Sequence, residues 1–283
     1  MTTLFLVATP IGNLEDISPR ALETLRAVSL IAAEDTRTAK QLLTYFEIHT
    51  PVTSFFEYSK TNKLERILDA LERGDVAVVS EAGMPGINDP GYELVREAIA
   101  RGHRVSPIPG PSAVLTALVA SGLPAHAFYY AGFLPREPQA RRRFLRDLVD
   151  ERDTLVVFET PHRLRDALED LENIFGAARR ICVARELTKK FEEFQRGTIR
   201  QVRAYFQTVE PRGEFTLVIG GQKSTVKRPT SSEDDAWDDV RVKREFNRLI
   251  AQGMPRTDAV KRIAKQSGRE RRAVYELTQR GGR

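Results

Sequence analysis

The sequence predicts two α/β domains followed by a small all-α tail. Short apolar runs alternate with helical patterns through residues 1–222, an order typical of sheets covered by helices. A polar, acidic stretch containing SSEDD follows, and three short helical patterns come after it. We therefore expect an α/β domain over residues 1–120, a second over 121–222, a linker over 223–239 and a helical domain over 240–283.

The first domain repeats strand, loop and helix. Ser18 suits a helix N-cap and Pro19 suits the first helical position. Later helical patterns appear around residues 42–46, 64–71, 91–99 and 114–121. Apolar runs predict strands over residues 4–8, 29–33, 52–55, 75–79 and 104–108. This order predicts a parallel sheet with helices on both faces.

The second domain has fewer helices between its strands. Strands are expected over residues 128–133, 154–158, 180–184, 194–199 and 214–219. Only residues 138–149 and 162–175 show a convincing helical pattern between them. Strands without crossover helices pair closely with their neighbours, so we expect a mixed sheet.

The basic charge of the chain is concentrated in its tail. Residues 240–283 hold 13 Lys and Arg against four acids, a balance of 13 − 4 = +9, whereas the whole chain is +5 and residues 1–239 are therefore 5 − 9 = −4. Helical patterns over 242–251, 256–265 and 269–279, with breaks at Gly253 and Ser267-Gly268, suit a helix-turn-helix module. An acidic core with a polyanion-binding appendage is one interpretation, and simple solvation of small helices is the other.

Several classes of protein are poorly supported. No run reaches the roughly 18 apolar residues of a membrane span, and no signal peptide is evident, so we expect a cytoplasmic protein. The single Cys182 and four scattered histidines show no zinc-ligand spacing, so no metal is expected. The G-x-G-x-x-G, Walker and G-x-S-x-G patterns are absent.

Loops rich in glycine and proline follow several predicted strands, at residues 9–13, 34–37, 81–91 and 109–113. The richest is SEAGMPGINDPG, residues 80–91, directly after a valine-rich strand. Ligands bind at the carboxyl ends of strands in open α/β sheets, and such loops suit a polar cofactor of several parts. The alternative is that they are tight turns needed only for the fold.

Seven ordered segments carry a family resemblance: VATPIGNLEDIS, AAEDTR, SEAGMPGINDPG, PIPGPSAVLTAL, FETPHR, ARELTKKFEEFQRG and GEFTLVIGG. Over residues 4–221 the chain resembles the tetrapyrrole-methylase-type (class III) methyltransferases, and within them the 16S rRNA (cytidine-2′-O)-methyltransferases. The basic tail is similar to the helix-turn-helix domain of that branch. Residues 84–88, MPGIN, depart from the expected Thr-Pro-Leu/Gly-Ile-Ser pattern, which puts one hydroxyl contact in doubt.

The resemblance implies S-adenosylmethionine in a cleft between two α/β domains, a homodimer, and 16S rRNA in the small ribosomal subunit as substrate. The target would be the ribose of a cytidine in the decoding region. Carried over by motif, the cofactor contacts are Pro10, Glu81, Gly83, Ile87, Asp89, Ser112, Ala113, Glu159, Arg185 and Phe215. Glu81 and Asp89 could instead hold their loop or cap a helix, and for Arg185 and Glu186 the alternative is a plain interdomain ion pair.

A ribose hydroxyl loses its proton during methyl transfer, so an acceptor is needed. Glu34, Asp35, Glu159 and His162 are candidates because each follows a strand, although Glu34 and Asp35 could simply cap the next helix. The expected RNA contacts are Asn13, Arg37, Lys40, Arg244, Arg269, Arg271 and Arg272. Two alternatives remain open: a methyltransferase for tetrapyrroles or other small molecules, and a non-enzymatic nucleic-acid-binding regulator.

Overall fold

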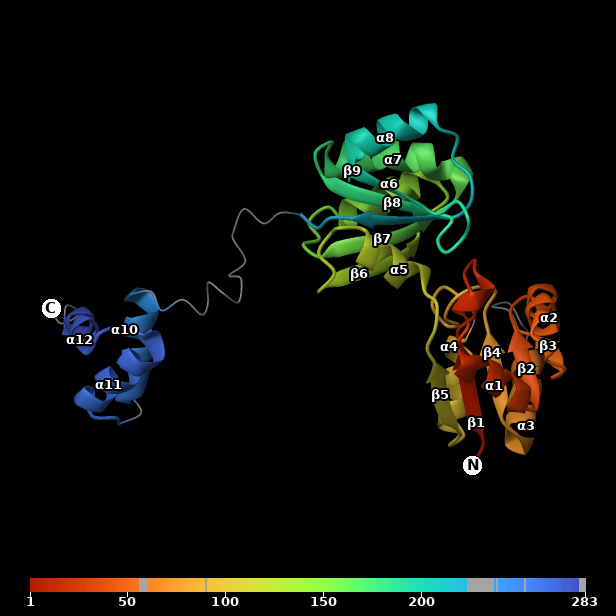
Figure 1. Cartoon of the computed structure of the whole chain (residues 1–283), viewed down its shortest axis with the longest axis horizontal. Coiled ribbons are helices and arrows are strands. Elements are labelled where there is room, and N and C mark those ends of the chain that lie inside the picture. The colour runs from red at the N-terminus through yellow and green to blue at the C-terminus, as the bar shows by residue number, and fades with distance from the viewer. Residues whose placement is uncertain (56–60, 90, 223–236, 238, 252, 280–283) are drawn as a thin grey trace. The chain divides into compact units, whose positions relative to one another are not determined.

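The computed structural model describes residues 1–55, 61–89, 91–222, 237, 239–251 and 253–279. It divides into two compact units, Met1–Gln222 and Lys223–Arg283, which are described separately (Figure 1). Most of the linker expected over residues 223–239 lies outside the described residues. No helix in the described ranges is long and apolar enough to cross a membrane.

The first sheet contains five parallel strands in the order β3-β2-β4-β1-β5, which confirms the predicted parallel sheet. The strands are β1 (Thr3–Val7), β2 (Leu30–Ala33), β3 (Val52–Ser54), β4 (Val76–Val79) and β5 (Arg104–Ile108). Because β2, β4, β1 and β5 are consecutive neighbours, the loops that follow them leave the same edge side by side.

Helices cover both faces of this sheet. On one face α1 (Pro19–Ala27) and α2 (Thr36–Tyr45) pack against β1 and β2, around residues such as Leu25 and Leu43. On the other face α3 (Thr61–Arg73) and α4 (Tyr92–Ala100) enclose Leu68 and Leu94. Ser18 caps α1 by accepting a hydrogen bond from the amide of Ala21, as its position before Pro19 predicts.

The second sheet is mixed, as predicted, with the order β6-β7-β10-β8-β9. Only the β6–β7 pair is parallel among the described strands of this sheet. The strands are β6 (Phe128–Phe133), β7 (Thr154–Glu159), β8 (Arg180–Arg185), β9 (Glu193–Thr198) and β10 (Phe215–Ile219).

Four helices flank the second sheet. α6 (Pro138–Asp147), α7 (Pro161–Phe175) and α8 (Ile199–Thr208) cover one face (Figure 1). The sequence analysis missed α8, although Thr198 and Gln201 form a capping box at its start. The other face is covered by α5 (Ala113–Ala120), which packs against Val156, Cys182 and Val218 although the predicted boundary at residue 120 assigns it to the first domain. Burial in this core raises the pKa of the Cys182 thiol.

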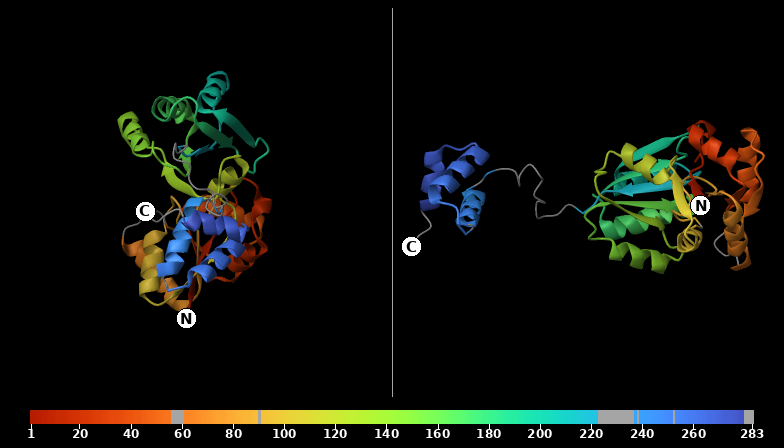
Figure 2. Two further views of the ribbon diagram at one scale, coloured as in Figure 1. Left: turned by 90° about the vertical axis from the view of Figure 1, so that its left-hand side faces the viewer. Right: turned by 90° about the horizontal axis from the view of Figure 1, so that it is seen from below.

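The described residues of the second unit form a helical bundle, drawn in blue in Figure 2. α10 (Asp239–Ala251), α11 (Arg256–Ser267) and α12 (Arg271–Gln279) follow the three predicted patterns. Their apolar side chains, including Phe246, Ile263 and Val274, form a separate core. Gly268 ends α11 in the left-handed conformation at φ 66°, which favours glycine.

Candidate functional site

The loops after β1 and β4 are joined by an isolated β-bridge. The Thr9 amide donates to the Gly83 carbonyl at 2.9 Å, and the Gly83 amide donates to the Thr9 carbonyl at 3.0 Å. Gly83 has φ 85°, a left-handed conformation that a side chain would strain. The bridge fixes the two loops against each other at the carboxyl edge of the sheet.

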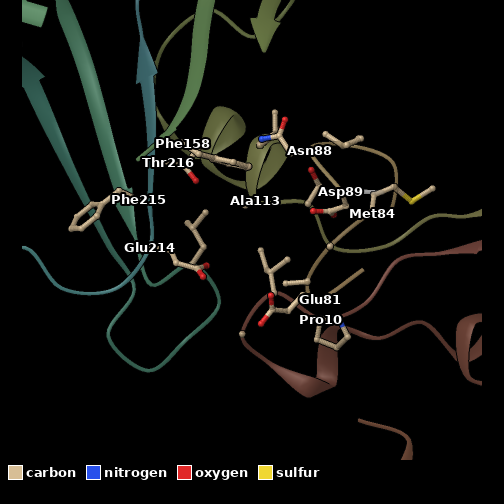
Figure 3. A pocket seen from close by; sticks show the side chains of 18 of the residues that line it. Pro10, Glu81, Met84, Asn88, Asp89, Ala113, Phe158, Glu214, Phe215 and Thr216 are labelled. Atoms are coloured by element: carbon tan, nitrogen blue, oxygen red, sulfur yellow. The ribbon is translucent and has the colours of Figure 1, made fainter. Parts of the chain in front are cut away.

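A cavity of about 680 Å³ opens between these loops and the second sheet, and we call it the main cavity. Its volume is typical of small-molecule sites. Pro10, Glu81 and Asp89 lie on one side, and Phe158 and Thr216 lie on the other (Figure 3). The predicted cofactor residues that line it are Pro10, Glu81, Gly83, Ile87, Asp89, Ser112, Ala113, Glu159 and Phe215. Ser112 also caps α5, whose first residue is Ala113.

Three carboxylates meet on the first-domain side of the main cavity. Oε2 of Glu34 accepts a hydrogen bond from the Glu81 amide at 3.2 Å. Burial, together with the negative charges of Glu34 and Glu81, raises the pKa of Asp89 to about 6, against an opposing hydrogen bond with Ser80. A bound cation would relieve the repulsion among these carboxylates, so this side of the cavity favours a positively charged group.

Asp35 has a different environment from Glu34. Its carboxylate caps α2 by accepting a hydrogen bond from the Arg37 amide at 2.7 Å, and it pairs with the Arg37 guanidinium at 2.8 Å. The hydrogen bonds from Arg37 lower the pKa of Asp35 to about 2. Asp35 does not line the main cavity, whereas Glu34 does. Of these two neighbours, Glu34 is the one placed to take a proton in the cavity.

The side chains of Glu159 and Phe215 lie on the face of the second sheet that α6, α7 and α8 cover. The two residues are paired across β7 and β10, and Phe215 belongs to the core beneath α6, α7 and α8. Phe215 points away from the other labelled cavity residues (Figure 3). Because side chains alternate along a strand, their neighbours Phe158 and Thr216 face the main cavity instead. Glu159 and Phe215 thus border the cavity mainly through their backbone.

Glu159 is bound to the start of α7. Its Oε1 accepts hydrogen bonds from the Thr160 amide at 2.7 Å and pairs with Arg163 at 2.6 Å, while Oε2 is buried without a partner in the described residues. Burial raises the pKa of Glu159, against the effects of Thr160 and Arg163. Arg163 also donates to the Leu134 carbonyl at 3.1 Å. This network ties α7 to the sheet.

Five other predicted residues of the first unit lie outside the main cavity. Arg185 forms an ion pair with Glu193 at 2.5 Å, across β8 and β9 of the second sheet rather than between the domains. His162 is exposed on the first turn of α7, and Asn13 caps a short 3-10 helix, Leu14–Asp16, through the Glu15 amide. Arg37 and Lys40 are exposed on α2.

The β8–β9 loop contributes residues that the sequence analysis did not select. Lys189 lines the main cavity and pairs with Glu186 at 3.1 Å. This loop also touches the β1 loop: a Cβ atom at Gly12 would lie only 2.8 Å from the Leu187 carbonyl oxygen. The only local signal for this segment is its charged run, ELTKKFEE. That run does not show that the loop lies against Gly12, because the contact joins residues far apart in the sequence. Glu214 and Thr216 were also missed beside Phe215.

In the second unit, the predicted RNA-binding arginines differ in their contacts. Arg269 pairs with Asp239 at 2.6 Å and Arg272 with Glu276 at 3.2 Å. Arg244 and Arg271 are exposed. α12 begins at Arg271 instead of the predicted Arg269, so Arg269 belongs to the turn and connects it to α10.

A parallel sheet and a mixed sheet that border one acidic cavity define a two-domain α/β ligand-binding unit. The family described as tetrapyrrole (corrin/porphyrin) methylases matches residues 3–203. The chain belongs to this family, as the resemblance predicted. Two solved structures share the fold: diphthine synthase, with a TM-score of 0.60 and 14% identity over 78% of this chain and 90% of that one, and uroporphyrin-III-C-methyltransferase from Thermus thermophilus, with 0.55 and 19% over 78% and 94%.

Curated relatives are similar over a greater length. Proteins named ribosomal RNA small subunit methyltransferase I are 43% identical in Halalkalibacterium halodurans, over 97% of this chain and 94% of the relative, and 43% identical in Synechocystis sp., over 98% of both. The protein of that name in Thermotoga maritima is 46% identical, with 79% of this chain covering all of the relative.

Proposed function

We propose that the protein transfers a methyl group from S-adenosylmethionine to the ribose 2′-hydroxyl of a cytidine in 16S rRNA. The position expected from the resemblance is cytidine 1402 in the decoding region, where the methyl group would support accurate translation. The observation that carries the proposal is 43% identity, over nearly the whole of both chains, to relatives named for methylation of small-subunit rRNA. Such a substrate also places the protein in the cytoplasm.

The main cavity fits this cofactor chemically. S-adenosylmethionine carries a sulfonium and an ammonium group, and the cavity offers Glu34, Glu81 and Asp89 on one side. Burial and the negative charges of Glu34 and Glu81 raise the pKa of Asp89, and a bound cation would offset both effects. Pro10, Ile87 and Ala113 supply apolar surface nearby, and about 680 Å³ is ample for a ligand of this size.

When bound, the cofactor supplies an activated methyl group on a good leaving group. The protein must hold the attacking oxygen in line with the methyl carbon and sulfur, which alone accounts for much of the catalysis. The ribose hydroxyl would lose its proton as it accepts the methyl group, so the protein must also provide a proton acceptor at the cavity. We assign this acceptor to Glu34, because its carboxylate is fixed at the cavity by the Glu81 amide.

Basic residues outside the cavity would bind the RNA backbone. Arg37 and Lys40 are exposed on α2, next to cavity residues Glu34 and Thr38. In the second unit Arg244 and Arg271 are exposed cations within a segment that carries a +9 balance over residues 240–283. Contacts of this kind neutralise phosphates and make binding depend on salt.

The protein is further proposed to act as a homodimer. β6 is an edge strand that pairs only with β7 among the described strands, and its Phe128, Tyr129 and Phe133 are exposed. Leu115 and Val119 of α5 are exposed as well, and α5 packs on the same sheet. Unpaired strand edges and exposed apolar side chains are typical of protein interfaces. Sedimentation equilibrium should show a dimer for the wild-type protein and a shift toward monomer for Phe128→Asp, a residue outside the main cavity, and a monomeric wild type would overturn the proposal.

The activity is tested with the full chain, labelled S-adenosylmethionine and small ribosomal subunits that lack the methyl group. Naked 16S rRNA and a porphyrinoid precursor serve as the competing substrates. We expect label in RNA, at one cytidine and resistant to alkaline cleavage at that nucleotide, as a 2′-O-methyl group is. Label in the porphyrinoid alone would favour the small-molecule alternative, and label in neither would overturn enzymatic methylation.

The role of Glu34 requires a separate measurement. Glu34→Gln should slow single-turnover methylation by about 10²–10³-fold and remove a pH-dependent limb, since the variant has no proton acceptor there. Asp35→Asn serves as the matched control, because Asp35 lies outside the cavity and caps α2. An unchanged rate and pH profile for Glu34→Gln would exclude it as the acceptor.

A further inference from the structure

A second cavity of about 370 Å³ lies between α2 and the first sheet, beside the main cavity. It shares Pro10, Leu14, Thr38 and Glu81 with the main cavity, so the two are contiguous. Its remaining lining residues are Thr9, Leu25, Ile31, Ala39, Gln41, Leu42, Leu43, Tyr45, Val79 and Ser80. None of the cofactor contacts implied by the resemblance lies here except Pro10 and Glu81, at the shared boundary.

A buried hydroxyl without a partner lines this second cavity. Thr9 is 3% exposed, and its Oγ1 has no hydrogen-bond partner in the described part of the chain. The backbone amide and carbonyl of Thr9 are already used in the bridge to Gly83, so this atom is its unsatisfied group. Buried polar groups are nearly always paired, so an unpaired hydroxyl in a cavity wall is available for a hydrogen bond with a molecule bound in that cavity.

The chemistry of the walls restricts what that partner can be. Leu25, Ile31 and Leu43 are apolar walls, whereas Thr38 and Gln41 add polar groups. This combination suits a ligand with an apolar face and a polar edge. A nucleobase has both features, and enzymes that act on nucleic acid read an extruded base by hydrogen bonds to its edge and by apolar packing on its faces.

The surroundings of the second cavity fit an RNA ligand. Tyr45, which lines it, is 64% exposed and offers an aromatic surface on which a base can stack. Arg37 and Lys40 are exposed on the same helix, where they can contact the flanking phosphates. A base held in this cavity would keep its own ribose at the shared boundary, beside Glu34 of the main cavity.

We infer that the second cavity binds the base of the acceptor nucleotide, turned out of its RNA stack, with Thr9 Oγ1 hydrogen-bonded to the base edge. This inference rests on the proposed methylation of RNA and adds the site that holds the acceptor. It also gives α2 two functions, since the helix provides one wall of the cavity and the cations beside it.

Two substitutions test the inference by different routes. Thr9→Val removes the hydroxyl at constant shape, and Ala39→Leu narrows the cavity from α2. Thr53→Val, on β3 and outside both cavities, is the matched control. Each protein is compared with wild type for thermal unfolding, for S-adenosylmethionine affinity by calorimetry, and for methylation kinetics on unmethylated small subunits.

We expect both cavity variants to fold and to keep the affinity for S-adenosylmethionine within twofold. The kcat/KM of Thr9→Val for subunits should fall about tenfold, the effect of one lost hydrogen bond in a buried site. The kcat/KM of Ala39→Leu should fall at least as far, because the larger side chain occupies the space of the base. A kcat/KM for subunits within twofold of wild type in both variants would overturn the inference. A tenfold loss of cofactor affinity would overturn it too, because the cavity would then hold part of the cofactor. If wild type itself methylates no RNA, the proposed function fails instead.

A fluorescent probe gives a direct readout of base position. An oligonucleotide from the decoding region with pyrrolocytidine at the acceptor position should brighten when wild-type protein unstacks the base, and brighten less with Ala39→Leu. Equal brightening with both proteins would place the extruded base outside the second cavity.

Discussion

Cofactor binding should weaken in mild acid because of Asp89. This carboxyl has a pKa of about 6, raised by burial and by the negative charges of Glu34 and Glu81. If the cationic cofactor binds the ionised form, protonation of Asp89 competes with binding. The carboxyl is deprotonated in about nine-tenths of molecules at pH 7 and in about one-eleventh at pH 5, so the apparent Kd should rise about tenfold between these values.

Calorimetric titration with S-adenosylmethionine from pH 5 to pH 7 measures this change. Over that range the ammonium and sulfonium of the cofactor keep their charge, so the protein alone titrates. The control is Asp89→Asn, which should bind more weakly at pH 7 and show a flat profile. A Kd that stays constant in wild type would refute the reasoning, and so would an equal slope in wild type and Asp89→Asn.

The same shift has a consequence for stability with a definite sign. The folded-state pKa of Asp89 lies above the ordinary value of 3.8, so the folded protein favours the protonated form. Protonation of Asp89 should therefore raise the free energy of unfolding as pH falls from 7 through 6. This contribution is complete below pH 4, where the carboxyl is protonated in the unfolded chain as well. Asp89→Asn should stabilise the cofactor-free protein at pH 7 by about 1–2 kcal/mol, after allowing for partial exposure, and by little at pH 4. A carboxylate kept at a cost in stability is typical of a binding site.

Three further predictions concern packing and the tail. Arg163→Met should lower the free energy of unfolding by about 3–5 kcal/mol, because it leaves the Glu159 carboxylate buried without its cation; the double variant with Glu159→Gln should recover part of the loss in a denaturant titration. Gly12→Ala should weaken cofactor binding, since its Cβ would lie 2.8 Å from the Leu187 carbonyl oxygen and push the two loops apart. An unchanged Kd for the cofactor in calorimetry would contradict this prediction. Deleting residues 230–283 should leave cofactor affinity intact but reduce the salt dependence of RNA binding, and an equal slope in a filter-binding assay would contradict a role for the tail.

The sequence predicted elements best where local chemistry marks them. Ser18 and Pro19 begin α1, and Ser112 caps α5, because capping depends on neighbouring residues. α8 was missed because the strand-like residues 194–199 run directly into it, and the Thr198 cap was not weighed against them. That α5 packs on the second sheet could not be predicted, because an apolar helix shows no preference for one of two nearby sheets.

The candidate site was predicted at the level of loops but not of side-chain direction. Parallel strands place their carboxyl ends together, which was enough to bring Pro10, Glu81 and Asp89 to one cavity. β7 and β10 are apolar on both faces, so their sequences do not show which alternate residues face the ligand. Because side chains alternate along a strand, an error of one residue in assigning the faces of β10 puts Phe215 at the cavity in place of Thr216. The second cavity depends on the packing of α1 and α2 against β2, β4 and the loops that follow β1 and β4, and it leaves no local pattern.

The distribution of charge separates two binding tasks within one chain. Acidic side chains are turned into the main cavity, where Asp89 and its neighbours suit a small cation. Basic side chains are exposed on α2 and in the tail, where they suit a polyanion. Because exposed charges are screened by salt and partly buried ones much less, salt should weaken RNA binding far more than cofactor binding. Moreover, the carboxylates would repel phosphate from the main cavity, which under the proposed function would keep the RNA backbone outside and admit a single nucleotide. The arrangement of charge thus favours an acceptor base bound in the second cavity, beside the carboxylates.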